Sequence, residues 1–279
     1  MPHQQFDRHQ VMMKPLGERQ NKHRIERDYI RLNETPSPLA DGVVAVIDQT
    51  VERIQAARNA GKPVILAYGA HSIKNGLGPV LIALMEHGWV THLATNGAGI
   101  IHDWEFTYLG ESGEDVQRYA SQGQFGNWQE TGFFLNLAIN IGAWRGMGYG
   151  ESVGAMVENE GLVIPAVEDL KAEIIEYASS NPRKSAAAAD LLFKIQDCDL
   201  RDGRLELAHP FKQFGVQAAA YRLGIPLTGH PMFGHDIIYN HAMNHGAAIG
   251  RAAQRDFLTF VNAVSQVDGG VYLSVGSAV

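Results

Sequence analysis

A glycine turn at residues 95–99 leads into three side chains that can move protons. The turn reads Thr95-Asn96-Gly97-Ala98-Gly99, and His102, Asp103 and Glu105 follow it. On a helix His102 and Glu105 share a face, which makes them an acid–base pair. The alternative interpretation is that Asp103 and Glu105 complement the helix dipole from the first turn. For Asp103 both interpretations stay open.

A second glycine turn, at residues 69–79, suits an anionic group. Backbone N–H groups at a strand-to-helix turn favour a phosphate, and Lys74 adds a positive charge. The glycine spacing is not G-x-G-x-x-G, so the ordinary dinucleotide fingerprint is absent. A plain strand-to-helix turn is the alternative. The residues expected to hold a cofactor here are Gly69, Ala70, His71, Ser72, Asn75 and Gly76.

A third cluster covers residues 230–245 and is rich in histidine. Asp236 follows His235 in it and is expected to face a substrate. His241 and His245 are four residues apart, a separation that binds metal from one helical face. The chain has no HExxH motif and no complete ligand set, so we predict no metal site.

Short apolar runs alternate with helical patterns around these turns. Strands are expected at 64–67, 90–95, 225–228 and 271–275, and helices at 41–60, 79–88, 215–223 and 257–266, with another from about 102. This alternation predicts an α/β fold: a Rossmann-like parallel sheet with helices on both faces. Ligands of such sheets bind at the carboxyl ends of the strands, so Gly276 and Ser277 are expected to close the same cofactor site.

Two parts of the chain lie outside this alternation. Residues 1–40 are expected to form an N-terminal arm with a short helix near 22–31, followed by one domain over 41–279. In the middle of the chain, residues 133–144 and 166–197 have helical patterns, the latter broken at Asn181-Pro182.

Composition restricts the class of protein. The 279 residues are 45% hydrophobic and 19% charged, as in globular proteins with a sizeable core. The formal net charge of -7 argues against nucleic-acid binding. One cysteine excludes an internal disulfide. We find neither the apolar run of a signal peptide nor about 20 apolar residues that would span a membrane, and expect a cytoplasmic protein.

The order of the motifs resembles that of the deoxyhypusine synthases. The resemblance is carried by the run from Gly76 to Val90, the turn 93–99, Ile225-Pro226 with Gly234-His235-Asp236-Ile237, and the closing stretch 271–279. It implies a Rossmann-like fold, NAD as cofactor, a homotetramer with sites at dimer interfaces, and aminobutyl transfer from spermidine to a lysine. An enzyme lysine accepts the carbon fragment in that family; aligned on this chain, it falls immediately past Val279.

The two glycine turns are also similar to the NAD-binding C-terminal domain of ornithine-cyclising enzymes. Here the matching residues are Gly69-Ala70 with Ile73-Lys74, and Asn96-Gly97 with His102-Asp103 and Glu105. Those enzymes convert ornithine to proline and recycle NAD.

Together these observations predict an NAD-dependent enzyme of the deoxyhypusine synthase type that acts on a small-molecule amine. We expect NAD at the turns 69–76 and 95–99, and His102, Asp103, Glu105 and Asp236 at the substrate, with Lys74 as the default covalent residue. The alternatives are a cyclodeaminase-type lyase, a non-catalytic NAD-binding protein, and a metal hydrolase built on the histidines of 230–245.

Overall fold

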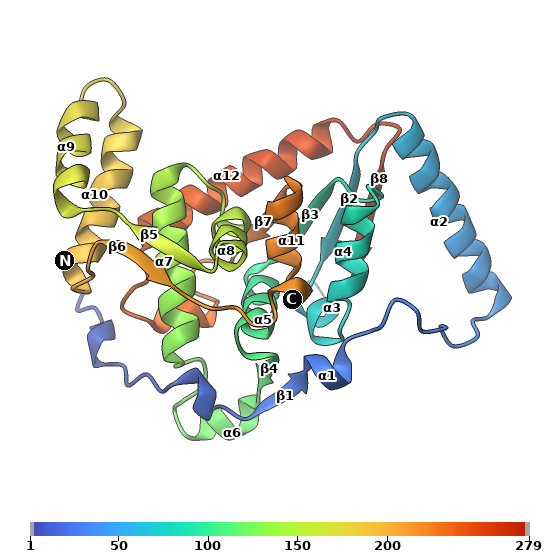
Figure 1. Ribbon diagram of the computed structural model, residues 1–279, viewed down its shortest axis with the longest axis horizontal. Coiled ribbons are helices and arrows are strands. Elements are labelled where there is room, and N and C mark those ends of the chain that lie inside the picture. Colours follow the sequence, from blue (N-terminus) through green and yellow to red (C-terminus); the bar gives the residue numbers. More distant parts are fainter. Residues whose placement is uncertain (1–2, 277–279) are drawn as a thin grey trace.

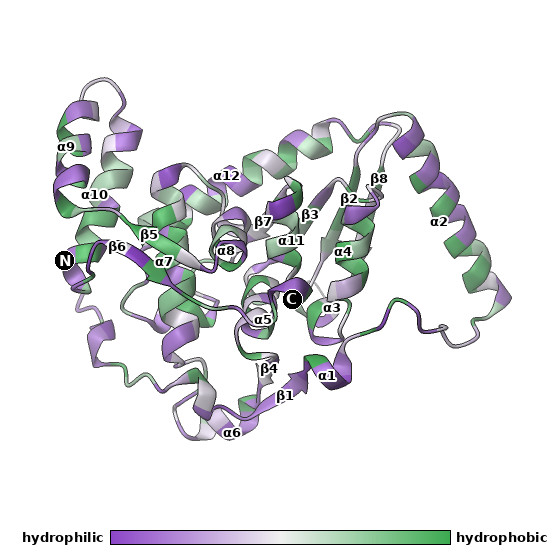
Figure 2. Ribbon diagram, viewed as in Figure 1, coloured by the Kyte–Doolittle hydropathy of each residue, from purple (hydrophilic) through white to green (hydrophobic). Residues whose placement is uncertain are grey.

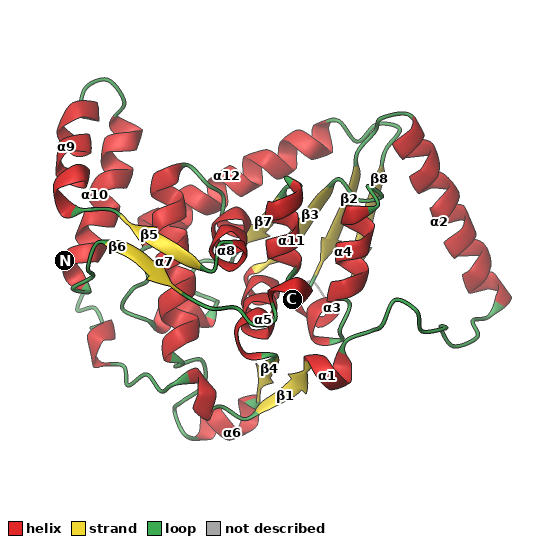
Figure 3. Cartoon of the chain, viewed as in Figure 1, coloured by secondary structure: helices red, strands yellow, loops and turns green. Residues whose placement is uncertain are grey.

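A parallel sheet forms the centre of the protein. The computed structural model describes residues 3–276. The sheet has four strands in the order β7-β3-β2-β8 (Figures 1 and 3). The strands are β2 (Val64–Tyr68), β3 (His92–Asn96), β7 (Leu227–His230) and β8 (Val271–Val275). All neighbours run parallel, with Tyr68 beside Thr95 and Val275 and with Asn96 beside His230. The carboxyl ends of all four strands therefore share one edge.

Helices cover both faces of this sheet, which confirms the predicted fold class. The helices of one face are α4 (Gly78–Glu86), α5 (Gly97–Leu109) and α11 (Val216–Leu223), and those of the other are α2 (Asp41–Asn59) and α12 (Gly246–Ser265) (Figure 1). The short helix α3 (Ala70–Lys74) follows β2 directly. Parallel strands need such crossover helices, because the chain must return to the same edge before each new strand.

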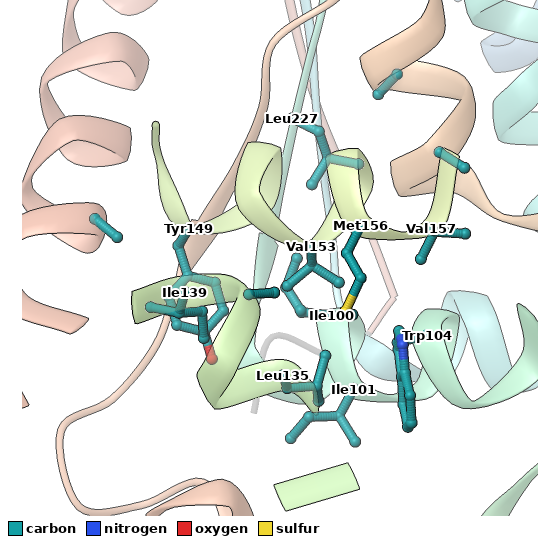
Figure 4. Packing of buried hydrophobic residues seen from close by; sticks show 14 of the residues in the cluster. Ile100, Ile101, Trp104, Leu135, Ile139, Tyr149, Val153, Met156, Val157 and Leu227 are labelled. Atoms are coloured by element: carbon teal, nitrogen blue, oxygen red, sulfur yellow. The ribbon is translucent and has the colours of Figure 1, made fainter. Parts of the chain in front are cut away.

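A helical layer extends the sheet beyond β7. It contains α7 (Gln129–Arg145), α8 (Tyr149–Glu158), the hairpin of α9 (Val167–Tyr177) and α10 (Pro182–Asp197), and a small sheet of β5 (Gly161–Ile164) and β6 (Gly203–Glu206). The predicted break at Asn181-Pro182 is confirmed, since Pro182 opens α10. Side chains of α5, α7, α8 and β7 meet in the core, among them Trp104, Leu135 and Met156 (Figure 4).

The N-terminal arm packs against the domain. Its strand β1 (Asn21–Arg24) pairs antiparallel with β4 (Glu111–Glu114), and Leu16 is completely buried. The helix predicted over 22–31 is therefore wrong in part: only α1 (Ile25–Asp28) is helical. The backbone of β1 bonds to β4 instead, a long-range pairing that local patterns do not encode. Short elements near the arm are η1 (Arg8–Gln10), η2 (Leu16–Glu18) and α6 (Val116–Ser121), and η3 (Lys212–Phe214) precedes α11.

The helix predicted over 41–60 is confirmed as α2, but its apolar side chains point to solvent. Val43, Val46 and Ile47 are 48%, 63% and 45% exposed. Apolar and polar residues mix along this helix (Figure 2). Exposed apolar patches of this kind often mark contact surfaces. Within residues 3–276, we find no helix with the length and apolar character to cross a bilayer.

Candidate functional site

Two neighbouring cavities lie at the carboxyl edge of the sheet. The first, which we call the sheet-edge cavity, has a volume of about 240 Å³. Its lining comes from the ends of all four strands and from α12, and includes Gly69, Thr95, Asn96, His230, Phe260 and Gly276. Four strand ends thus converge where ligands of open parallel sheets bind.

The second cavity, which we call the Asp236 cavity, has a volume of about 410 Å³. It lies between α5, the arm and the segment after β7. The residues that could do chemistry in its lining are Lys74, His102, Glu105, Glu114, His235 and Asp236. Ala98 lines it too, while Asn96 lines the sheet-edge cavity, so both cavities border the N-terminus of α5.

The start of α5 is shaped for close approach. Asn96 caps the helix, and its side-chain oxygen accepts a hydrogen bond from the Gly99 N–H at 2.8 Å. A Cβ atom on Gly97 would lie 1.9 Å from Oδ2 of Asp236, and one on Gly99 would lie 2.1 Å from the Thr95 hydroxyl oxygen. Glycine at 97 therefore lets the Asp236 carboxylate rest on the first turn of α5.

Asp236 is a buried carboxylate without a direct partner. Its side chain is 7% exposed, and Oδ2 has no hydrogen-bond partner among residues 3–276. The Nδ1 atom of the exposed His235 lies 4.0 Å from Oδ1. Burial raises the pKa of Asp236 to about 6, and His235 opposes this only weakly. An anion held this way would gain strongly from a cation entering the cavity.

His102 faces the same cavity and is neutral. Burial lowers its pKa to about 4; Glu105 raises this pKa, whereas Lys74, Arg19 and His23 lower it further. Its Nδ1 atom lies 2.7 Å from the Ser112 hydroxyl oxygen. A neutral imidazole beside an unpaired carboxylate can take up a proton from a cationic ligand.

Glu105 lines the Asp236 cavity, but its carboxylate is already bound by other side chains of the protein. Its carboxylate is fully buried and binds the Arg19 guanidinium through two hydrogen bonds of 2.8 and 2.5 Å. It also accepts hydrogen bonds from Thr131 and Ser112. Arg19 therefore neutralises the carboxylate that the sequence analysis expects to bind a ligand.

Asp103, which the sequence also predicts at the substrate, lines neither cavity. Its carboxylate accepts hydrogen bonds from the backbone N–H groups of Val216 and Gln217 at 2.9 Å, and from the Gln217 amide at 3.0 Å. Asp103 thus caps α11. Neither sequence interpretation, substrate contact or dipole partner of its own helix, describes this role.

We expect Asp103→Asn to lower stability and leave ligand binding unchanged. Asparagine keeps one acceptor oxygen but turns an NH2 group toward donors, which should cost about 1–3 kcal/mol. Urea unfolding measures this cost. Gln217→Ala, which removes one donor of the same cap, is the matched control and should cost less. A raised Kd for a ligand of the Asp236 cavity with unchanged stability would contradict the capping role.

Only some of the residues predicted to hold a cofactor at the glycine turn 69–76 line a cavity. Gly69 and Gly276 line the sheet-edge cavity, and the Ser72 hydroxyl donates to the Val275 carbonyl at 3.4 Å. The Lys74 side chain lines the Asp236 cavity, and burial lowers its pKa. The remaining predicted residues, which line neither cavity, are Ala70, His71, Asn75 and Gly76. Ser277 lies outside the described residues.

Gly76 serves packing instead of binding. It has a positive φ of 79°, and a Cβ atom there would lie 1.9 Å from the Asp28 carbonyl oxygen of the arm. The turn therefore curls against the arm, which separates its second half from the sheet edge.

The histidines of 230–245 do not come together as a set of metal ligands in the described part of the chain. The segment from His241 to His245 follows η4 (Ile237–Asn240) and is not helical, so the expected helical pair does not exist. His241 uses Nδ1 to accept a hydrogen bond from the Met243 N–H at 3.0 Å. Residues 3–276 contain no group of three or more side chains suited to a metal ion.

Comparison with known proteins gives distant structural relatives. Neither the protein-family models nor the curated protein sequences match the chain. ArgZ, an arginine dihydrolase from the ornithine-ammonia cycle in cyanobacteria, is 13% identical over 88% of this chain and 25% of its own, with a TM-score of 0.39. AgrE, solved in a ternary complex with ornithine and NAD+, is 17% identical over 88% and 26%, with a TM-score of 0.40.

A conserved LOR/SDH protein from Methanococcus maripaludis S2 is 12% identical over 91% of this chain and 69% of its own, with a TM-score of 0.34. The chain spans about a quarter of the length of ArgZ and AgrE. The fold assignment rests on the strand order of the chain itself.

Proposed function

We propose that the chain is an NAD-dependent enzyme that oxidises an amine-bearing substrate. The observation that carries this proposal is the unpaired, buried Asp236 carboxylate, which shares one cavity with the neutral imidazole of His102. A protonated amine satisfies Asp236, and the imidazole takes the proton that the amine must lose before oxidation.

The residues of the sheet-edge cavity fit NAD. Bare backbone at Gly69 and Gly276 allows close approach of phosphates, and Phe260 and Tyr272 add aromatic surface for a ring. Thr95 and Asn96 supply polar atoms beside them. Bound at these residues, NAD would supply the hydride acceptor for oxidation of the carbon next to the substrate nitrogen. The chain's own part is to hold the amine against Asp236 and to exclude water around it.

Two reactions are consistent with this first oxidation. One is aminoalkyl transfer of the deoxyhypusine synthase type from a polyamine, the reaction that the motif order implies. The other is a cyclodeaminase-type lyase reaction on ornithine, the amino acid bound with NAD+ in AgrE. Lys74 favours the lyase reaction on ornithine. Among residues 3–276 no carboxylate contributes to its pKa, so the Lys74 ammonium is available to bind the carboxylate of an amino acid whose amine lies at Asp236. A polyamine has no such group and would be repelled.

Native mass spectrometry of the purified chain, with and without NAD, tests the proposal first. We expect up to one NAD per subunit in a homotetramer, for which the exposed apolar side chains of α2 offer contact surface. The products formed from ornithine, putrescine and spermidine in the presence of NAD are then identified, because an enzyme that recycles NAD accumulates no NADH. Proline from ornithine supports the lyase, and transfer of an aminoalkyl group supports the synthase type. Failure to bind NAD at millimolar concentration overturns the proposal.

A further inference from the structure

A chain of hydrogen bonds connects His102 to the N-terminal arm. The His102 Nδ1 atom lies 2.7 Å from the Ser112 hydroxyl oxygen, and that oxygen lies 2.6 Å from Oε2 of Glu105. Glu105 in turn binds Arg19. Ser112 is completely buried, and it comes from β4, the strand that pairs with the arm. The chemistry of these four side chains decides which atom carries the hydrogen in each hydrogen bond.

Glu105 can only accept hydrogen bonds. The Arg19 guanidinium keeps it ionised, and an ionised carboxylate has no proton to donate. At 2.6 Å the Ser112 hydroxyl must therefore point its hydrogen at Glu105, since two facing lone pairs would repel. A hydroxyl has one hydrogen, so the Ser112 oxygen is left as the acceptor of a hydrogen from His102.

We infer that Ser112 fixes His102 as the tautomer with hydrogen on Nδ1. The bare Nε2 atom then faces the Asp236 cavity, where no residue of 3–276 hydrogen-bonds to it. Nε2 is the base of the site, and Ser112, with Glu105 and Arg19 behind it, is a positioning residue. The tautomer stands on hydrogen-bond geometry alone, whereas its use in catalysis rests on the proposed function.

The proton transfer balances within this arrangement. An N–H proton of the substrate's ammonium moves to Nε2, which leaves a neutral amine and an imidazolium. The imidazolium carries hydrogen on both nitrogens, and its charge faces Glu105 through Ser112. The other charged groups around His102 are Lys74 on α3, Arg19 and His23 on the arm, and Asp236 across the cavity. Glu105 favours the imidazolium, whereas burial and the cations Lys74 and Arg19 oppose it.

The arm completes this relay, although it lies far from the site in sequence. Arg19 and Glu105 are 86 residues apart. Leu16, which is fully buried, and the β1–β4 ladder hold the arm in place, and the Leu16 N–H donates to Glu130 at 2.6 Å. Without the arm Glu105 would be a buried, unpaired carboxylate able to take up a proton, and the direction of the relay would no longer be fixed.

Nitrogen-15 NMR of the full chain tests the tautomer directly. Long-range proton–nitrogen correlations of the imidazole ring distinguish the two neutral tautomers, and His102→Gln identifies the His102 signals. We expect hydrogen on Nδ1 in the wild type near neutral pH. In Ser112→Ala we expect the other tautomer or a mixture, and a fall in kcat of about 10- to 100-fold. Ser112→Thr, which restores the hydroxyl, should restore both. Ser185→Ala removes a buried hydroxyl on α10 and should change neither.

The outcomes separate the inference from the proposed function. Hydrogen on Nε2 in the wild type overturns the inference, whatever the activity. Hydrogen on Nδ1 that persists in Ser112→Ala overturns the positioning role of Ser112. Hydrogen on Nδ1 that is lost in Ser112→Ala supports the inference, and if no amine is then converted to product in the presence of NAD, the proposed function alone fails.

Discussion

Asp236→Asn should abolish amine oxidation while leaving the protein as stable as before or more stable. The carboxylate is the anion that a substrate ammonium would pair with, and losing one partner of a buried charge pair costs about 2–5 kcal/mol of binding. We therefore expect kcat/KM to fall by at least about 30-fold. The asparagine side chain is nearly isosteric and removes a buried charge that has no partner among residues 3–276.

The stability gain should depend on pH. Burial raises the pKa of Asp236 to about 6, so the folded protein holds this proton up to that pH. The unfolded chain releases it near pH 4, at the ordinary value for aspartate, which is about 3.9. The stability that this group contributes is therefore lost as pH rises from about 4 to 6, and the cost is complete above 6. Asparagine does not titrate.

Thermal or urea unfolding at two pH values checks this expectation. We expect Asp236→Asn to gain about 1–3 kcal/mol over the wild type near pH 8 and almost nothing near pH 4. Asp190→Asn on α10, which loses the partly exposed pair with Arg251 of α12, is the control and should keep its activity. Retained amine oxidation, or a loss of stability at pH 8, would contradict the role of Asp236.

The parts of the fold that the sequence predicts well are those with local signals. Short apolar strands closed by glycine and followed by helices identify β2 and β3, and parallel pairing then brings Gly69 and Asn96 to one edge. These inferences need only the order of elements and the rule that strand carboxyl ends meet. Asp236 enters the predicted site differently, through the segment Gly234-His235-Asp236-Ile237 that carries the resemblance to the deoxyhypusine synthases.

The roles of the charged side chains on α5 could not be read in this way. Periodicity indicates which residues share a face of a helix but not which face meets a ligand. The sequence therefore gives no reason to place His102 at the cavity and Asp103 elsewhere. They diverge because α11 packs on one side of the helix and the arm on the other. The sequence does contain one signal for Glu105: its neighbours are apolar residues that become buried, and a buried glutamate needs a cation as partner. The sequence does not say which arginine supplies it.

Ser112 was missed because nothing in its surroundings marks it. It lies in β4, a strand of four residues that contains a glycine, and its importance comes only from its contacts with His102 and Glu105. Propensity scales disfavour such a strand, whereas pairing with β1 creates it. Residues that work through a partner distant in sequence therefore emerge only with the structure.

Arg19→Met should destabilise the protein by about 3–5 kcal/mol, because it leaves the Glu105 carboxylate buried without its cation. Both side chains of the pair are 1% exposed. Burial by itself raises the pKa of Glu105, but Arg19 overcomes this and holds the pKa below its ordinary value. Without Arg19, nothing would offset the effect of burial, so the pKa of Glu105 should rise and Glu105 should take up a proton at higher pH than in the wild type.

A double-mutant cycle identifies the pair as the cause. Adding Glu105→Gln to Arg19→Met removes the unpaired charge, so the double variant should recover part of the lost stability. Arg24→Met is the control on the same arm: its partner Glu111 lies 3.2 Å away, but the Arg24 side chain is 56% exposed, and surface pairs contribute about 0–1 kcal/mol. If Arg19→Met costs no more than Arg24→Met in urea unfolding, the arm does not dock on α5 in solution. Glu105 would then keep only the hydrogen bonds from Ser112 and Thr131, and these neutral hydroxyls cannot balance the charge of a buried carboxylate. The hydrogen-bond chain to His102 would therefore no longer end on an ionised Glu105.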